Sequence, residues 1–292
     1  MPALQWRGTV ALPPEFQFSQ GSLQDYVDCP RRFQLRYLLH LAWPAPIAEP
    51  MLTYEQHMQD GDAFHRLVHQ HILGLSADRL SLCVQPEQEA LCRWWDNYLS
   101  GDPARLPGSR YPELGLSAAL GDHQLGARYD LVIFNPGREA VIFDWKTALS
   151  RPRRSALAVR LQTRVYRYLL VRAGSALNGY LPLVPEQVRM VYWFAEFPAD
   201  PETFEYDARQ YAADEAYLAD LIRQIAACGD QDLAITADAR ACAYCVYRSL
   251  CERGTRAGEV SQAGADLEQA GGPEANGPEA AFSYEQISEI AF

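Results

Sequence analysis

The sequence predicts a mixed α/β fold built around a β-hairpin that is followed by a helix and a further strand. Two β-rich runs, 129–134 and 140–146, are separated by residues 135–139, where Asn, Pro and Gly favour a turn. The two runs are therefore predicted to pair as antiparallel strands. Residues 187–194 are rich in apolar and aromatic side chains and predict another strand. A hydrophobic content of 48% over 292 residues is sufficient for a buried core.

The chain before the hairpin is predicted to be mainly helical. Residues 1–18 contain three prolines and little periodicity, which indicates an extended lead-in. Pro30 suits the first turn of a helix, so Cys29 is expected at a junction between two helices. Residues 54–75 predict a longer helix, and residues 78–110 an aromatic-rich helix followed by a loop. The buried stripe of the 54–75 helix is expected to comprise Phe64, Leu67, Val68, His71, Ile72 and Leu75.

Other segments complete the predicted order. Residues 113–118 are expected to form an entry strand, 202–206 a short strand and 208–227 a helix. Residues 254–280 are rich in Gly, Ala and Glu and predict a flexible linker. Residues 281–292 regain aromatic side chains and isoleucine. They are expected to form a short acidic helix that docks on a partner or on the chain's own basic face, with a disordered tail as the alternative.

The charge is unevenly distributed along the chain. The net charge is −11, but seven acidic residues and no basic residue follow Arg256, which leaves −4 for residues 1–258. Residues 151–172 contain seven arginines and no acidic residue, so this segment is a candidate phosphate-binding face, with a solvated helix face as the alternative. We found neither a run of 18 apolar residues nor a secretory signal, so the protein is expected to be cytoplasmic and without a membrane partner.

A single lysine follows a carboxylate at the end of the predicted hairpin. Lys146 is the only lysine in the sequence, and the other 25 basic residues are arginine. Side chains alternate along a strand, so Asp144 and Lys146 point the same way, and antiparallel pairing brings Asp130 close to them. Converging carboxylates suit Mg²⁺ or Mn²⁺, and with a neighbouring ammonium they suit phosphodiester hydrolysis. A partly buried Asp-Lys ion pair is the structural alternative.

The pattern Asp130, Asp144-x-Lys146 and Gln162-x-x-x-Tyr166 resembles the PD-(D/E)xK nuclease superfamily, specifically its RecB-like branch. The resemblance covers most of residues 19–251. It implies a restriction-endonuclease-like core with the order helix, three strands, helix, strand, within a nuclease domain at 19–253 that has additional helices and a cysteine-stapled terminal region.

The resemblance also implies roles for individual residues. Asp130, Asp144, His65 in a Gly-x-x-x-His setting, and the main-chain carbonyl of Trp145 are expected to hold the metal ion. Lys146 is expected to stabilise the transition state or position the attacking water, and Gln162 and Tyr166 to position substrate. The hypothesised phosphate contacts are Arg160, Arg164 and Arg167. Glu113 is either an additional ligand or a surface carboxylate, and a zinc pair of His65 with His69 is a rival interpretation.

Four of the seven cysteines predict a second metal site. Cys242, Cys245 and Cys251 lie within ten residues, and Cys29, next to Pro30, is the best candidate for a fourth ligand. Spacing does not distinguish zinc from an iron-sulfur cluster. The layout resembles the iron-sulfur nucleases, such as the AddB nuclease domain and the nuclease of CRISPR adaptation, which implies a structural [4Fe-4S] cluster. Zinc and unligated thiols remain the alternatives.

The predicted function is that of a metal-dependent DNA nuclease acting on ends or single strands in repair, recombination or CRISPR-type processing. The sequence contains no helicase P-loop, so unwinding is expected to come from a helicase or repair partner. A noncatalytic, cluster-stapled DNA-binding subunit is the competing hypothesis. A zinc-bearing RNA-processing protein is a third.

Overall fold

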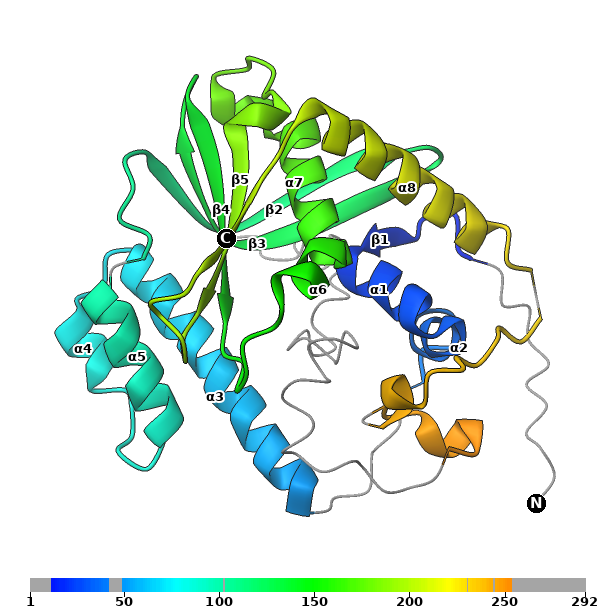
Figure 1. Ribbon diagram of the computed structural model, residues 1–292, viewed down its shortest axis with the longest axis horizontal. Coiled ribbons are helices and arrows are strands. Elements are labelled where there is room, and N and C mark those ends of the chain that lie inside the picture. Colours follow the sequence, from blue (N-terminus) through cyan, green and yellow to red (C-terminus); the bar gives the residue numbers. More distant parts are fainter. Residues whose placement is uncertain (1–11, 42–48, 102, 230, 244, 254–292) are drawn as a thin grey trace, which may run out of the picture.

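The computed structural model describes residues 12–41, 49–101, 103–229, 231–243 and 245–253, in which a central sheet of six strands has helices on both faces (Figure 1). The strands are β1 (Gln17–Ser19), β2 (Ser109–Leu120), β3 (His123–Asn135), β4 (Glu139–Lys146), β5 (Val188–Phe194) and β6 (Glu202–Glu205). The α-helices are α1 (Gln20–Asp28), α2 (Pro30–Phe33), α3 (Glu49–Ile72), α4 (Ala77–Ser81), α5 (Glu89–Gly101), α6 (Arg154–Val159), α7 (Leu161–Ala173) and α8 (Ala208–Ala226). The predicted mixed α/β class is confirmed.

The sheet has the strand order β1-β3-β4-β5-β6, and β2 pairs with the other edge of β3. β4 is antiparallel to β3 and parallel to β5, as expected for a hairpin followed by a helical crossover. On one side of β3, β1 pairs with residues 124–126 and β4 pairs with residues 131–135. Residues 127–130 lie between these two pairings. Asp130 therefore stands where β4 leaves β3.

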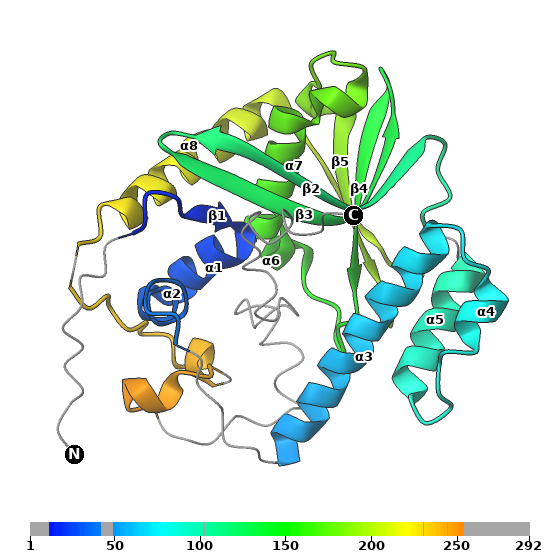
Figure 2. The same ribbon diagram turned by 180° about the vertical axis from the view of Figure 1, so that it is seen from behind.

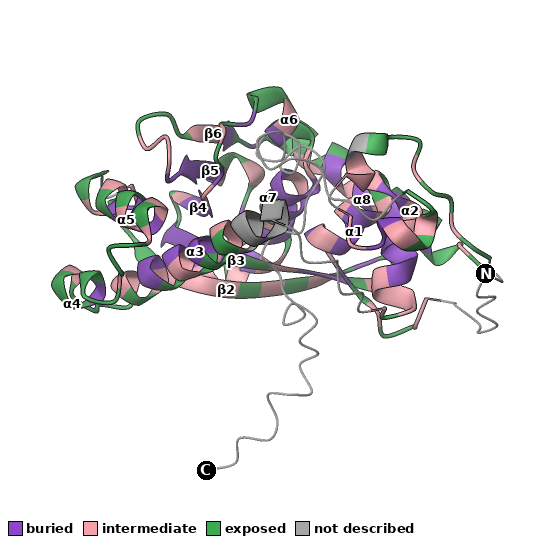
Figure 3. Cartoon of the chain, turned by 90° about the horizontal axis from the view of Figure 1, so that it is seen from below, coloured by how far each residue is buried: buried purple, intermediate pink, exposed green. Residues whose placement is uncertain are grey.

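The sheet lies between two hydrophobic cores, because side chains along each strand point alternately to its two faces. On one face, Val132, Ile142 and Met190 pack with residues of α1, α7 and α8. On the other, Leu131 and Phe143 pack with residues of α3 and α5. Figures 1 and 2 show these helix layers from opposite sides, and Figure 3 shows that β4 and β5 are buried between them. Val132 and Phe134 of β3 and Ala140 and Ile142 of β4 consequently lie on the face that α7 covers, and so do Asp144 and Lys146, which continue the alternation of β4.

Several elements differ from the sequence prediction. The expected helix in 78–110 is two helices, α4 and α5, and the strand predicted at 113–118 is longer. Leu75 follows the end of α3 and is 44% exposed, so its assignment to the buried stripe was wrong. A short strand, β1, lies within the expected lead-in. The predicted linker at 254–280 and the acidic segment at 281–292 lie outside the described residues.

The helix expected in the arginine-rich segment is divided into α6 and α7, and the charges of α7 have partners on another helix. Arg164 Nη1 donates to Asp214 Oδ1 of α8 at 2.8 Å. Arg167 is buried, and its Nη1 donates to the Glu205 carbonyl at 2.7 Å. Tyr206 also donates to Asp214, at 3.0 Å. The acidic partners that the local sequence lacks are supplied by tertiary structure.

Among the described residues, no helix is both long and apolar enough to cross a membrane.

We expect Asp214→Ala to lower the free energy of unfolding by about 3–5 kcal/mol, because it leaves the buried Tyr206 hydroxyl and the Arg164 guanidinium without their acceptor. Chemical denaturation followed by circular dichroism measures this loss. Asp220→Ala is the matched control, since Asp220 pairs with Arg223 on the exposed face of the same helix. It should change stability by less than about 0.5 kcal/mol. Equal effects of the two substitutions would contradict the assignment.

Candidate active site and thiol group

Asp144 and Lys146 lie on the α7 face of the sheet, and Asp130 lies beside them at the end of the β3–β4 ladder, within reach of His65 on α3. Leu131 pairs with Phe143, and the same register continued by one residue places Asp130 opposite Asp144. Asp130 Oδ2 accepts the backbone N–H of Trp145 at 2.8 Å. Lys146 Nζ lies 3.0 Å from Asp144 Oδ2. The structure thus brings these side chains to the same region of the sheet.

Gln162, in the first turn of α7, joins the two ends of the Asp144–Lys146 pair. Its Nε2 donates to Asp144 Oδ1 at 2.6 Å, and its Oε1 accepts from Lys146 Nζ at 3.1 Å. Asp144 and Gln162 are both buried. The start of α7 is held by α1, because Gln24 Oε1 accepts the N–H of Leu161 at 3.1 Å. The buried carboxylate therefore has a hydrogen-bonding amide and an ammonium as partners.

Tyr192 of β5 and Thr163 of α7 extend this network, and the sequence analysis missed both. The Tyr192 hydroxyl lies 3.4 Å from Gln162 Oε1 and 2.7 Å from Thr163 Oγ1. Burial, followed by the charge of Asp144, raises the pKa of Tyr192. Tyr192 is opposite Asp144 in the parallel β4–β5 register. The sequence analysis placed Tyr192 in the strand predicted at 187–194 without a role, and the signal that could have identified it is this long-range register.

His65 lies on α3, which precedes the hairpin in the sequence, and its side chain lies near Asp130. Its Nδ1 lies 3.5 Å from Asp130 Oδ1. Burial lowers the pKa of His65, but the charge of Asp130 and the hydrogen bond to it outweigh burial and raise that pKa to about 9. The pKa of Asp130 is lowered below its ordinary value. Burial alone would raise it, but the charge of His65 and the hydrogen bonds from His65 and the Trp145 N–H outweigh burial.

A glycine allows α3 to come this close to the end of β4. A Cβ at Gly61 would lie 3.0 Å from Thr147 Oγ1, the residue directly after Lys146. Gly61 is four residues before His65, so the close approach and the histidine are on the same face of α3. This contact gives a physical reason for glycine in the Gly-x-x-x-His pattern.

Tyr166, one turn after Gln162, is in the hydrophobic core. It is 6% exposed, and its ring centroid lies 4.8 Å from that of Tyr129. The Tyr129 hydroxyl donates to the Tyr166 carbonyl at 2.9 Å. The predicted role of Tyr166 in positioning substrate stays a prediction.

The three arginines proposed as phosphate contacts lie in different environments. Arg164 and Arg167 are engaged with α8 and the end of β6, as described above. Arg160 is the N-cap residue of α7, and its buried Nη2 has no hydrogen-bond partner within the described ranges. The Arg160 charge is also close enough to Tyr192 to oppose the rise of the tyrosine pKa. Arg167 is also near Tyr192, so Arg160 differs from the other two by this nitrogen without a partner in the described structure.

Glu113 lies on β2, opposite Asp130 of β3. The flanking pairs are Pro112 with Leu131 and Leu114 with Tyr129. Glu113 has a φ of 52°, a left-handed conformation that is uncommon for a residue with a side chain. Its carboxylate accepts from Arg128 Nε at 2.5 Å. The carboxylate is therefore near the site and paired with an exposed guanidinium.

The donor set fits a hard divalent cation in its chemistry. Asp130 and Asp144 supply carboxylate oxygens and His65 an imidazole, which are ligand types that Mg²⁺ or Mn²⁺ accepts. In the described part of the chain, no three His, Cys, Asp or Glu side chains are already arranged as a metal site. Asp130 is instead held by His65 and the Trp145 N–H, and Asp144 by Lys146 and Gln162.

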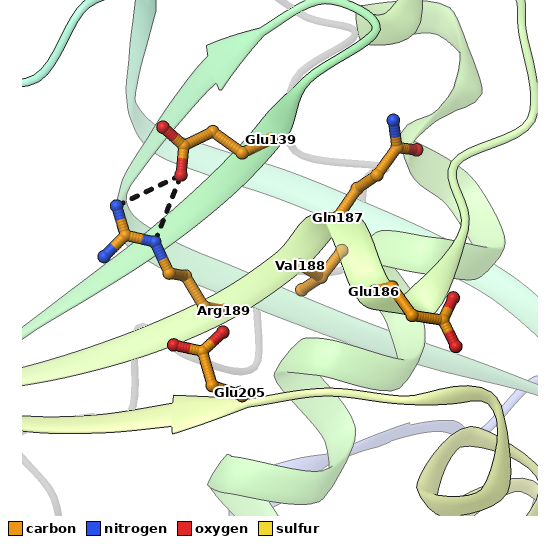
Figure 4. A pocket seen from close by; sticks show the side chains of 6 residues that line it. All are labelled: Glu139, Glu186, Gln187, Val188, Arg189 and Glu205. Atoms are coloured by element: carbon orange, nitrogen blue, oxygen red, sulfur yellow. Dashed lines mark hydrogen bonds and ion pairs between the residues drawn. The ribbon is translucent and has the colours of Figure 1, made fainter.

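A cavity of about 240 Å³ lies at the opposite end of these strands (Figure 4). It is lined by Glu139, Glu186, Gln187, Val188, Arg189 and Glu205. Arg189, its one basic residue, is paired with Glu139 at 3.1 Å. A predominantly acidic lining repels phosphodiesters, so this cavity is not a candidate for the nucleic-acid site.

Cys29 and the three C-terminal cysteines are neighbours in the folded chain. Cys29 lies between α1 and α2, as predicted from Pro30. Burial and the nearby Cys29 raise the pKa of Cys242, and burial raises that of Cys245. Burial, then Cys245 and Cys29, raises the pKa of Cys251 to about 11. All four cysteines are free thiols.

Direct protein contacts bring the C-terminal segment to these helices. The Arg31 N–H donates to the Ala234 carbonyl at 3.1 Å. The Gln34 amide donates to the Gln231 carbonyl at 3.1 Å and accepts from the Leu233 N–H at 3.0 Å. These contacts hold the C-terminal segment next to Cys29. Four thiols are the donor type and number that a zinc ion or an iron-sulfur cluster takes.

Comparisons with known proteins identify a family. The solved structures that a structural search matched include a protein called SSO0001, at 13% identity and a TM-score of 0.38, covering 82% of this chain and 87% of that one. Another is the "Putative exonuclease" from Eubacterium rectale, at 10% identity and a TM-score of 0.43, covering 75% and 85%. At such TM-scores these likenesses establish nothing about function. A search of curated proteins found no match.

The family model of the PD-(D/E)XK nuclease superfamily matches residues 17–252, which include the strands β1–β6, the helices α1–α8 and the four-thiol set. The match covers most of the 292 residues. The chain belongs to the PD-(D/E)XK nuclease superfamily.

Proposed function

We propose that this protein is a metal-dependent deoxyribonuclease of the RecB-like branch that acts on DNA ends or single strands. The observation that supports the proposal most is the contact of Asp144 and Lys146 with each other and with the Gln162 amide, next to Asp130 at the end of the β3–β4 ladder. Membership of a nuclease superfamily supports phosphodiester hydrolysis. Because the sequence has no P-loop, we propose that a helicase or repair partner supplies any unwinding.

The residues of the site have different proposed roles. Asp130, Asp144, His65 and the Trp145 carbonyl would hold Mg²⁺ or Mn²⁺, which polarises a phosphoryl oxygen and lowers the pKa of bound water. Lys146 supplies a positive charge for the phosphate as negative charge develops on it, and Gln162 holds the ammonium in place. Arg160, at the N-cap of α7, supplies a guanidinium for a neighbouring phosphate.

Lys146→Ala should lower cleavage of labelled single-stranded DNA in Mn²⁺ by about 100-fold or more, because it removes the charge that stabilises the transition state. Initial rates on DNA, and on RNA of the same sequence, measure the loss and the sugar preference. Arg189→Ala is the control, since Arg189 pairs with Glu139 at the opposite end of the sheet and should retain activity. Tight DNA binding by the wild-type protein without cleavage would instead support a noncatalytic DNA-binding subunit.

Gly61→Ala should lower the cleavage rate by roughly tenfold, because the added methyl meets Thr147 Oγ1 and displaces His65 from Asp130. The double variant Gly61→Ala/Thr147→Ala should recover most of the rate, since it removes the atom that the methyl meets. Gly101→Ala is the control, where the nearest atom is 4.0 Å away. Failure of the double variant to recover, with unchanged melting temperature, would show that the contact does not position His65.

We further propose that Cys29, Cys242, Cys245 and Cys251 hold a [4Fe-4S] cluster with a structural role. The proximity of Cys29, from the start of the chain, to the three C-terminal cysteines supports the proposal. Ligand binding would release the thiol protons and couple metal content to folding.

Anaerobically purified protein should be brown, with about four iron and four sulfide per chain. Serine at any of the four positions should remove the colour and most of the iron. Cys83→Ser and Cys92→Ser are matched controls, because these thiols lie in the α4–α5 region and donate to local carbonyls. A colourless protein with one equivalent of zinc would overturn the cluster and favour the zinc alternative.

A further inference from the structure

We propose that Tyr192, supported by Thr163, is a positioning residue that fixes the orientation of the Gln162 amide. The inference rests on the proposed nuclease function and extends it to two residues outside the family pattern. Tyr192 is buried and lies on β5, beside the strand that carries Asp144 and Lys146.

The amide of Gln162 has one orientation that its two charged partners accept. A carboxylate accepts hydrogen bonds and an ammonium donates them, so the amide nitrogen must face Asp144 and the oxygen must face Lys146. A half-turn of the amide would place N–H groups against the ammonium and the oxygen against the carboxylate. The correct orientation is favoured while both partners remain in place.

Tyr192 provides a third constraint that is independent of the two charges. Its hydroxyl lies 3.4 Å from Gln162 Oε1, and since an amide oxygen only accepts, the tyrosine is the donor in this contact. Thr163 Oγ1 lies 2.7 Å from the same hydroxyl and 2.6 Å from the Leu157 carbonyl. The two hydroxyls have two protons, so when Tyr192 donates to Gln162, Thr163 donates to Tyr192 and not to the carbonyl. Thr163 directly follows Gln162 in the first turn of α7, so its hydroxyl holds the Tyr192 hydroxyl beside the amide that it orients.

This constraint matters when substrate engages Lys146. A phosphate that attracts the ammonium weakens its contact with Gln162 Oε1, and the tyrosine hydroxyl then holds the oxygen toward the lysine. The Lys146 ammonium also lies 5.6 Å from the centroid of the Tyr192 ring. Phenylalanine keeps that ring, so Tyr192→Phe removes the hydroxyl and leaves the cation–π contact.

Tyr192→Phe should lower kcat for DNA cleavage by about 10- to 100-fold, with KM changed less than about twofold, as expected for loss of a residue that orients a site group. Thr163→Val tests the same chain from its other end and should act in the same direction, whereas Thr163→Ser keeps the hydroxyl and should retain most of the rate. Tyr206→Phe is the matched control, because it also removes a buried hydroxyl, but one bonded to Asp214. It should leave kcat unchanged.

A double-mutant cycle tests whether Tyr192 acts through Gln162. In a Gln162→Ala background, Tyr192→Phe should have no further effect on kcat, because the group it orients is absent. An equal loss in both backgrounds, or no loss in the wild-type background, would overturn the inference. Wild-type protein that does not cleave, or Lys146→Ala protein that cleaves normally, would instead refute the proposed nuclease function, so the two failures are distinguishable.

Discussion

The site depends on the register between β3 and β4. Pairing of Leu131 with Phe143 brings Asp130 opposite Asp144 at the end of the ladder. There the Asp130 carboxylate accepts the Trp145 N–H, and the side chain satisfies a backbone donor where the strands separate. A shift of one residue would turn Asp144 and Lys146 toward α3 and away from Gln162. The two hydrophobic cores oppose that shift, because it would move every apolar side chain of β4 to the other face.

Features that depend on local periodicity could be predicted from the sequence. The common face of Asp144 and Lys146 follows from the alternation of a strand, and the position of Cys29 follows from Pro30. Helical spacing also placed Gln162 and Tyr166 on one face of α7, but it does not predict which of the two reaches the carboxylates and which packs in the core. Gln162 begins the helix beside the end of β4, whereas Tyr166 packs one turn further over Tyr129.

Features set by distant segments could not be predicted in the same way. The arginines of α7 have no acid nearby in sequence, and Asp214 becomes the partner of Arg164 only when α8 packs on α7. The contact of Tyr192 with Gln162 requires the parallel register of β4 and β5, which a helical crossover separates in sequence. Such partners arise from topology, and single-sequence periodicity carries no information about them.

Helix α1 connects the thiol group with the nuclease face. Cys29 directly follows the end of α1. Gln24, on the same helix, donates to Asp28 Oδ1 at 2.8 Å and accepts the Leu161 N–H, which fixes the start of α7. Gln162 is the next residue. A ligand that joins Cys29 to the C-terminal cysteines would restrain the end of α1 against a segment about 200 residues away in sequence. Gln34, which follows α2, already contacts that segment through the Gln231 carbonyl. The same restraint would stabilise the first turn of α7, so a ligand held by the thiols would contribute to the order of the site without contacting its carboxylates.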